Sequence, residues 1–177
     1  MKHISFQQVE TEEQQSQAKE LILEYLSWLN NHVKLTYNFG FDIAAMVGSD
    51  MNDSAKFRPP WGRFYLALVE NKVAGVGCLK KIDDDTGELQ RMYVLPAFRG
   101  MGIGRAILDR LMYDARAIGY SKLKLESLEF LHEAHALYRS AGFKEIKPYA
   151  DNSMKSYQSP ETIDRYYSIT VFMEFSF

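Results

Sequence analysis

The chain contains a single cysteine, Cys78, and it has no large excess of either charge. One thiol cannot form a disulfide within the chain, and no cysteines and histidines stand at zinc-finger spacing, so we expect a reducing compartment. The sequence has 21 lysines and arginines against 23 aspartates and glutamates, which gives a net charge of −2. Binding to the phosphates of nucleic acids depends on a basic excess, so no nucleic-acid partner is expected.

Long apolar runs are also missing. Residues 1–10 mix polar and apolar side chains and lack the continuous apolar segment of a signal peptide. No run approaches the roughly 18 apolar residues of a membrane span. We therefore expect a cytoplasmic protein with no membrane partner. The 177 residues, 46% of them hydrophobic, suit one folded domain over 1–177 and exclude a disordered chain.

The spacing of the apolar residues predicts an α/β (α+β) chain built around one sheet. Helical spacing predicts a helix that begins after the cap Thr11, a short helix over 41–47, one that ends at Ile118 before Gly119, and one over 131–141. Residues 49–62 and 149–164 resemble loops. Alternating spacing predicts strands over 3–9, 63–70, 73–80, 88–95, 122–127, 143–147 and 166–175.

Turn residues give a first indication of the topology. Asn71-Lys72 is expected to form a two-residue hairpin turn, and residues 83–87 a second turn, so residues 63–95 should form three consecutive antiparallel strands. After Pro96 the order becomes helix, strand and helix, which is typical of a parallel crossover.

Three alternating glycines lie between a predicted strand and a predicted helix, in the segment Arg99-Gly100-Met101-Gly102-Ile103-Gly104-Arg105. Glycines let a ligand approach the backbone, and a helix N-terminus presents free N–H groups to an anion such as phosphate. The spacing does not match the dinucleotide fingerprint, because the sixth position is Arg105 or Ile107. The Gly-Lys-Ser/Thr of a P-loop is also absent.

This segment resembles the pyrophosphate signature Gln/Arg-x-x-Gly-x-Gly/Ala of the GCN5-related N-acetyltransferases (GNAT). The segments 88–96 and 136–143 resemble those that flank the signature, so the likeness spans about residues 63–147. It implies a single mixed, mostly antiparallel and splayed sheet flanked by helices. It also implies direct transfer of an acetyl (acyl) group from acetyl-CoA to an amine in a ternary complex, with no metal.

The resemblance assigns roles to individual residues. The backbone amides from Arg99 to Arg105, including Gly100, Met101, Gly102, Ile103 and Gly104, would hold the pyrophosphate of acetyl-CoA. Val94 would pair through its backbone with the pantetheine arm, and the Met92 N–H would stabilise the developing oxyanion. Many members of the family have an asparagine where this chain has Leu131, which removes one expected contact to the cofactor.

Transfer to an amine requires a base and an acid. Glu88 stands where several family members keep a base, and Tyr138 can protonate a departing thiolate because its usual pKa is near 10. Glu88 could instead be a solvated carboxylate or a partner of Arg91, and Tyr138 a core residue. A non-catalytic acyl-CoA-binding or sensing module therefore stays open as the alternative function.

The acceptor is expected to be a small molecule with a primary amine, and segments 37–64 and 149–167 are expected to form its pocket. A homodimer formed through residues 166–177 stays open. The candidate substrate residues are Trp28, Tyr37, Phe41, Phe57, Arg58, Trp61, Tyr149 and Asn152.

No metal site is expected. His132 and His135 are one position too close for the His-Glu-x-x-His signature, so they are expected to be a partly exposed pair. The acidic turn at 83–87 lacks the glutamate that closes an EF-hand loop. Cys78 lies in the middle of a predicted strand and is expected to be a buried, unreactive side chain.

Overall fold

The computed structural model describes residues 3–177, and its centre is a mixed seven-stranded sheet in the order β1-β2-β3-β4-β5-β7-β6. Neighbouring strands are antiparallel, except that β4 and β5 are parallel. The mixed, mostly antiparallel sheet that the resemblance implied is confirmed. The strands are β1 (Ile4–Gln8), β2 (Arg63–Val69), β3 (Lys72–Lys81), β4 (Thr86–Val94), β5 (Lys122–Leu128), β6 (Lys144–Ile146) and β7 (Thr170–Ser176).

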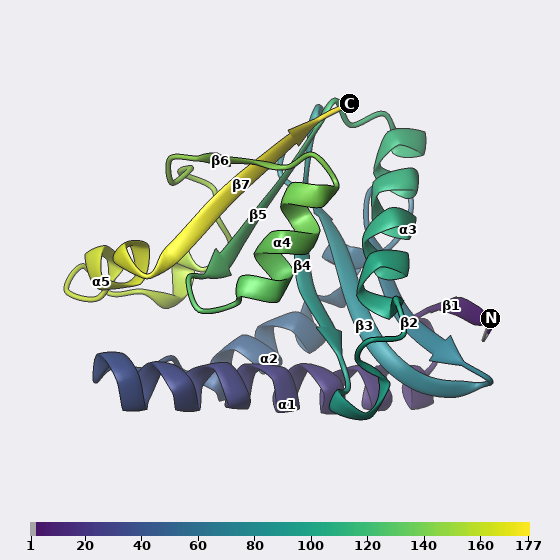
Figure 1. Ribbon diagram of the computed structural model, residues 1–177, viewed down its shortest axis with the longest axis horizontal. Coiled ribbons are helices and arrows are strands. Elements are labelled where there is room, and N and C mark those ends of the chain that lie inside the picture. Colours follow the sequence, from purple (N-terminus) through teal and green to yellow (C-terminus); the bar gives the residue numbers. More distant parts are fainter. Residues whose placement is uncertain (1–2) are drawn as a thin grey trace.

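Helices cover both faces of this sheet (Figure 1). One apolar core lies under α1 and α2, and a second core lies under α3 and α4. The helices are α1 (Glu12–Tyr37), α2 (Ile43–Asn52), α3 (Ile103–Ile118), α4 (His132–Ser140) and α5 (Ile163–Ser168), with short 3-10 turns η1 (Ser54–Phe57), η2 (Pro96–Phe98) and η3 (Lys155–Tyr157).

The long helix α1 begins, and the long helix α3 ends, where the sequence predicts. Thr11 caps α1 by accepting from the Gln14 amide, and the Gln14 side chain accepts from the Thr11 amide, which completes a capping box. Gly119 ends α3 with a φ of 107°, a left-handed conformation that glycine adopts without strain. These local signals fix the position of α3, which carries the glycine loop at its N-terminus.

The sheet splays between β4 and β5. The two strands pair only over Thr86–Glu88 and Lys122–Lys124, and beyond Glu88 they diverge. Val94, at the end of β4, therefore lies at the open end of the splay (Figure 1). Parallel neighbours separate at this opening, which forms the site described below.

A β-bulge distorts β4 just beyond the last β4–β5 pair. Val76 pairs with Tyr93 and Cys78 with Gln90, so Gly77 alone stands opposite both Arg91 and Met92. Arg91 has a φ of 52°, which is rare for a residue with a side chain. The extra residue interrupts the regular hydrogen-bonded ladder at Arg91 and Met92.

Two of the predicted turns and loops differ in detail. The first hairpin turns at Glu70-Asn71 and not at Asn71-Lys72, because a turn of this type needs a positive φ at both central residues, here 50° and 65°. The loop expected over 49–62 is partly helical, since α2 continues to Asn52 and η1 follows it. Asp42 caps α2 through the amide of Ala45, so that helix begins at Ile43.

The strand predicted over 166–175 is wrong in its first part. Residues 163–168 form α5, where the Tyr166 amide donates to Thr162 O and the Tyr166 ring is buried against α1 and α2. Alternating apolar residues there suggested a strand, although the same residues also fit a single helical turn. The final strand β7 lies between β5 and β6, and β6 pairs with Phe172, Met173 and Glu174 of it.

Candidate active site

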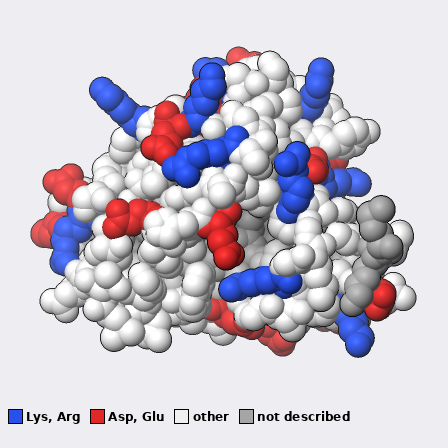
Figure 2. All heavy atoms as spheres, viewed as in Figure 1, with Lys and Arg blue, Asp and Glu red and all other residues white. Residues whose placement is uncertain are grey.

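A cavity of about 860 Å³ occupies the splay between β4 and β5. Figure 2 shows that this face of the molecule is hollowed near its centre, with basic and acidic side chains at the margin. The cavity reaches from the glycine loop to α1 and α2. Its wall includes these residues from the sequence analysis: Trp28, Phe41, Met92, Val94, Arg99, Gly100, Gly102, Ile103, Gly104, Arg105 and Tyr138.

The glycine loop leaves its outer surface open. Gly100 and Gly102 have φ values of +75° and +78°, and a Cβ at either position would meet nothing within 4 Å. Ala106 donates the first backbone bond of α3, to Gly102 O at 3.0 Å. The amides before Ala106 therefore have no acceptor within the helix, and together with the helix dipole they favour an anion.

Arg99 ties this loop to β4 and α1. Its Nε donates to the Val94 carbonyl at 3.2 Å, and its guanidinium stands 5.7 Å from the ring centres of both Trp28 and Tyr93. A cation over two aromatic rings is held in place while its charge stays at the surface. Arg105 is exposed and pairs with Asp109 at 2.8 Å. The two arginines thus flank the loop on either side.

Met92 and Tyr138 meet across the cavity. The Tyr138 hydroxyl lies 3.9 Å from the Met92 sulfur, which is its one hydrogen-bond contact among residues 3–177. Burial raises the pKa of Tyr138 well above its usual value, so the hydroxyl keeps its proton at neutral pH. Tyr138 therefore stands in the wall as a protonated group beside the bulge that carries the Met92 amide.

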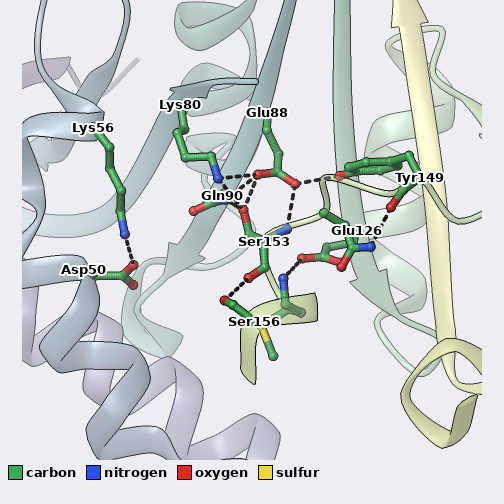
Figure 3. Close-up of polar contacts among 11 residues, drawn as sticks. Asp50, Lys56, Lys80, Glu88, Gln90, Glu126, Tyr149, Ser153 and Ser156 are labelled. Atoms are coloured by element: carbon green, nitrogen blue, oxygen red, sulfur yellow. Dashed lines mark hydrogen bonds and ion pairs between the residues drawn. The ribbon is translucent and has the colours of Figure 1, made fainter. Parts of the chain in front are cut away.

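Glu88 lies behind the cavity wall and is fully buried. Its Oε1 accepts from the Tyr149 hydroxyl at 2.7 Å and from the Ser153 amide at 3.3 Å, and Lys80 Nζ stands 3.4 Å from Oε2. The side-chain amide of Gln90 and the Ser153 hydroxyl also donate to Oε2. Figure 3 shows this closed network, which occupies both oxygens of the residue expected to be a base.

Two carboxylates line the cavity, the exposed Glu133 and the more buried Glu126, and the sequence analysis missed Glu126. It lies on β5 just past the last β4–β5 pair, and its Oε1 accepts from the Met154 amide at 3.0 Å. Its Oε2 is sealed from solvent and has no hydrogen-bond partner, although the Tyr166 hydroxyl lies nearby. A charged residue within a central strand was the signal available in the sequence.

The environment of Glu126 makes it a weak acid. Burial, followed by the charge of Glu88, raises the pKa of Glu126 to about 8. A carboxyl with that pKa exchanges protons near neutral pH, which is the property that a general base or acid requires. The successive amides of Ser153 and Met154 hold the two carboxyl groups side by side (Figure 3).

The other predicted substrate residues lie outside the lining. Tyr149 donates its hydroxyl to Glu88, and the side-chain amide of Asn152 donates to the Tyr149 carbonyl oxygen at 2.6 Å, so both residues support Glu88. Tyr37 donates to Glu129 at 2.6 Å on the surface. Trp61 and Arg58 line a separate surface hollow, with Lys81 Nζ 4.6 Å from the Trp61 ring centre. Phe57 is fully buried, and Met101 is exposed beside the glycine loop.

The histidine pair is only half exposed. His135 is buried and lies 3.1 Å from Ser127 Oγ, whereas His132 is exposed. The pair as a whole is partly exposed, as expected, because α4 turns only His135 toward β5. Cys78 is buried, as predicted.

Among residues 3–177 no cluster of three or more histidine, cysteine or acidic side chains could hold a metal ion. No helix in this part of the chain could span a membrane.

The site can now be compared with known proteins. A family model described as "Acetyltransferase (GNAT) family" matches residues 16–143. An uncharacterized N-acetyltransferase of Schizosaccharomyces pombe is 30% identical over 156 residues, which cover 85% of this chain and 88% of that protein. An uncharacterized N-acetyltransferase of Escherichia coli K12 is 36% identical over 93 residues, or 51% of this chain and 56% of that protein.

A solved structure gives the fold comparison. The PaiA N-acetyltransferase of Thermoplasma acidophilum, in complex with coenzyme A, superposes with a TM-score of 0.67. The two chains are 17% identical, and the superposition covers 99% of each. The whole chain, with its splayed sheet and the loop before α3, thus has the fold of that protein.

Proposed function

The chain belongs to the GNAT family of acetyltransferases, and from this premise we propose that it transfers an acetyl group from acetyl-CoA to the primary amine of a small molecule. One observation carries the proposal: a single cavity holds an open glycine loop at one end and the poorly paired carboxyl of Glu126 at the other. Such a cavity admits both substrates together, which suits direct transfer in a ternary complex.

The residues present fit coenzyme A. The free amides from Gly100 to Arg105 suit a pyrophosphate, and the absence of a Cβ at Gly100 and Gly102 leaves room for it. Beyond Glu88, β4 has no strand partner on its β5 side, so the backbone near Val94 can pair with an extended amide-bearing arm. When bound, acetyl-CoA would supply an acetyl group activated as a thioester.

The bulge provides a donor for negative charge. Since Arg91 and Met92 share one partner residue on β3, the ladder does not use all of their amides. We assign the Met92 N–H to the carbonyl oxygen that gains charge during transfer. A fixed backbone donor in a largely apolar cavity stabilises such charge without any rearrangement.

We assign the proton transfer from the amine to Glu126, with Glu88 acting behind it. Glu126 lines the cavity, so its carboxyl can accept the amine proton there. The negative charge of Glu88 keeps the pKa of Glu126 high enough for this exchange near neutral pH. Tyr138 holds a proton at its hydroxyl, where it is available to a departing thiolate.

The rival function is a module that binds acyl-CoA without transferring the acyl group. A binding module has no use for a buried, half-satisfied carboxyl in the same cavity as the loop, because such a group destabilises the fold. The test measures thiol release from acetyl-CoA with a panel of amino acids, polyamines and aryl amines, with the product identified by mass. Amine-dependent release supports the transferase. Tight CoA binding without release for any amine supports the sensing module.

A further inference from the structure

Arg91 is a charged residue of the cavity wall that the proposed reaction does not use. Its side chain is 8% exposed and lines the cavity. The bulge lets Arg91 reach the α2 side of the sheet, where its Nε donates to Oδ2 of Asp50 at 2.6 Å. Gln90, the residue before it, reaches Glu88 on the same side. The positive φ at Arg91 thus accompanies a guanidinium that lies in the cavity wall.

One carboxylate serves two cations at this wall. Asp50 is 1% exposed and accepts from Arg91 through Oδ2, while Lys56 Nζ stands 3.3 Å from Oδ1 (Figure 3). Lys80 and Glu88 form a second ion pair, in which each offsets the charge of the other. Of these three cations, Arg91 is the one that lines the cavity, so it is the one that can meet an anionic group of a ligand.

Donors are available for that group. Asp50 occupies only the Nε–H of Arg91, and among residues 3–177 neither Nη atom donates to a protein acceptor or is sealed from solvent. The Tyr25 ring lines the same cavity, and the charge of Arg91 acts on its hydroxyl. A guanidinium whose two Nη groups are free can still bind a carboxylate through the edge that they form.

The carboxylate position and the amine position share one chamber. Arg91 is near enough to Glu126 for its charge to act on that carboxyl. In the sheet, Gln90 and Glu126 follow Glu88 and Lys124, the last paired residues of β4 and β5, so Arg91 and Glu126 lie on neighbouring strands at the start of the splay. One small molecule can therefore contact both.

The wall that α1, α2 and the segment between them contribute to this cavity is mostly apolar. Leu26 and Leu29 come from α1, Phe41 from the connection to α2, and Met46 from α2. These side chains offer no hydrogen bonds, so they suit an aliphatic or aromatic substituent and disfavour a second charged group.

We propose that the acceptor is an amino acid with an apolar side chain, whose carboxylate binds Arg91 while its amine faces Glu126. This inference rests on the proposed function, because it takes Glu126 to be the group that meets the amine. Arg91 is then a specificity residue, and the positive charge around Asp50 selects for the carboxylate of the acceptor.

Matched substrate pairs test the proposal in the unaltered protein. Leucine is compared with isoamylamine and with leucinamide, and phenylalanine with phenethylamine, in acetyl-CoA-dependent thiol release. We expect kcat/KM to be about 10- to 100-fold higher for each amino acid than for its partner, the range expected for a hydrogen bond to a charged group. Calorimetric titration with and without CoA should give the same order of affinities, independently of turnover.

The variant Arg91→Lys keeps the charge and removes the planar fork. The ratio of kcat/KM for leucine to that for isoamylamine should fall toward one, through KM, whereas the exposed control Arg116→Lys should keep the ratio of the parent. Thermal unfolding shows whether each variant is folded. If Arg91→Lys does not fold, the substrate pairs measured on the unaltered protein still show whether a carboxylate on the acceptor is preferred.

The outcomes distinguish a failure of the amino-acid proposal from a failure of the proposed acetyltransferase function. Release that is equal or faster with isoamylamine and phenethylamine overturns the amino-acid proposal and leaves the acetyltransferase in place. Faster turnover of aspartate or lysine than of leucine overturns the apolar part. No release with any amino acid or amine overturns the proposed function, and the inference falls with it.

Discussion

The amide of Met154 donates to Oε1 of Glu126 at 3.0 Å and leaves Oε2 of the same carboxyl without a partner. The amide of the preceding residue, Ser153, donates to Glu88. A short segment between β6 and η3 therefore holds one carboxyl fully engaged and the other half engaged. Glu88 is therefore expected to contribute only its charge, whereas Glu126 can exchange a proton.

The pH dependence of turnover should report this pair. Because burial and Glu88 raise the pKa of Glu126 to about 8, kcat/KM should rise with pH and level off above that value. Glu88→Gln removes a negative charge, so the midpoint should move to lower pH. A midpoint unchanged in Glu88→Gln, measured with thiol release from pH 6 to 10, would show that the two carboxyl groups are not coupled.

The free energy of unfolding should also depend on pH through the raised pKa of Glu126. The folded state of the parent keeps a proton on Glu126 that the unfolded chain, with a pKa near 4.5, has already lost. Stability is therefore lost as pH rises from 4.5 through 8, at about 1.4 kcal/mol per pH unit. Glu126→Gln removes this loss, so urea unfolding should show the variant gaining on the parent between pH 5 and pH 9. The exposed control Glu129→Gln should show no such trend.

Tyr138→Phe should lower kcat about 10- to 10⁴-fold and leave the affinity for CoA within a few-fold. The hydroxyl contacts only the Met92 sulfur within residues 3–177, so its removal leaves no strong hydrogen bond broken. The variant should accordingly unfold near the temperature of the parent. Full activity in Tyr138→Phe would remove the acid role from this residue.

Gly102→Ala should weaken CoA binding in a calorimetric titration. A Cβ at a φ of +78° strains the loop by roughly 1 kcal/mol and projects into the open surface that a pyrophosphate would use. Gly119→Ala is the matched control, because its φ of +107° gives comparable strain at the other end of α3. Both variants should lose stability, and only Gly102→Ala should lose affinity; equal affinities would place the pyrophosphate elsewhere.

The predictable parts of this protein are those that local sequence encodes. The capping box at Thr11, the stop at Gly119 and the alternating glycines each act over a few residues, so the start of α1, the end of α3 and the glycine loop were recognised correctly. The burial of Glu88 was not recognised, because it depends on Tyr149 and Ser153, which are more than 60 residues away in the chain.

Glu126 was missed for a related reason. Its role comes from where β4 and β5 part, and no pattern within 122–128 marks that point. Tyr166 illustrates the opposite error, since an alternating pattern suggested a strand where tertiary packing favours the short helix α5.

The activity of Glu126→Gln tests the central claim most directly. Thiol release from acetyl-CoA is measured with the best amine at saturating concentrations, from pH 6 to 10, for the parent, Glu126→Gln and Glu129→Gln. We predict that Glu126→Gln loses about 10²- to 10⁴-fold in kcat and loses the rise near pH 8, while CoA affinity and the Glu129→Gln control match the parent. Parental rates with the same pH profile in Glu126→Gln would contradict the account.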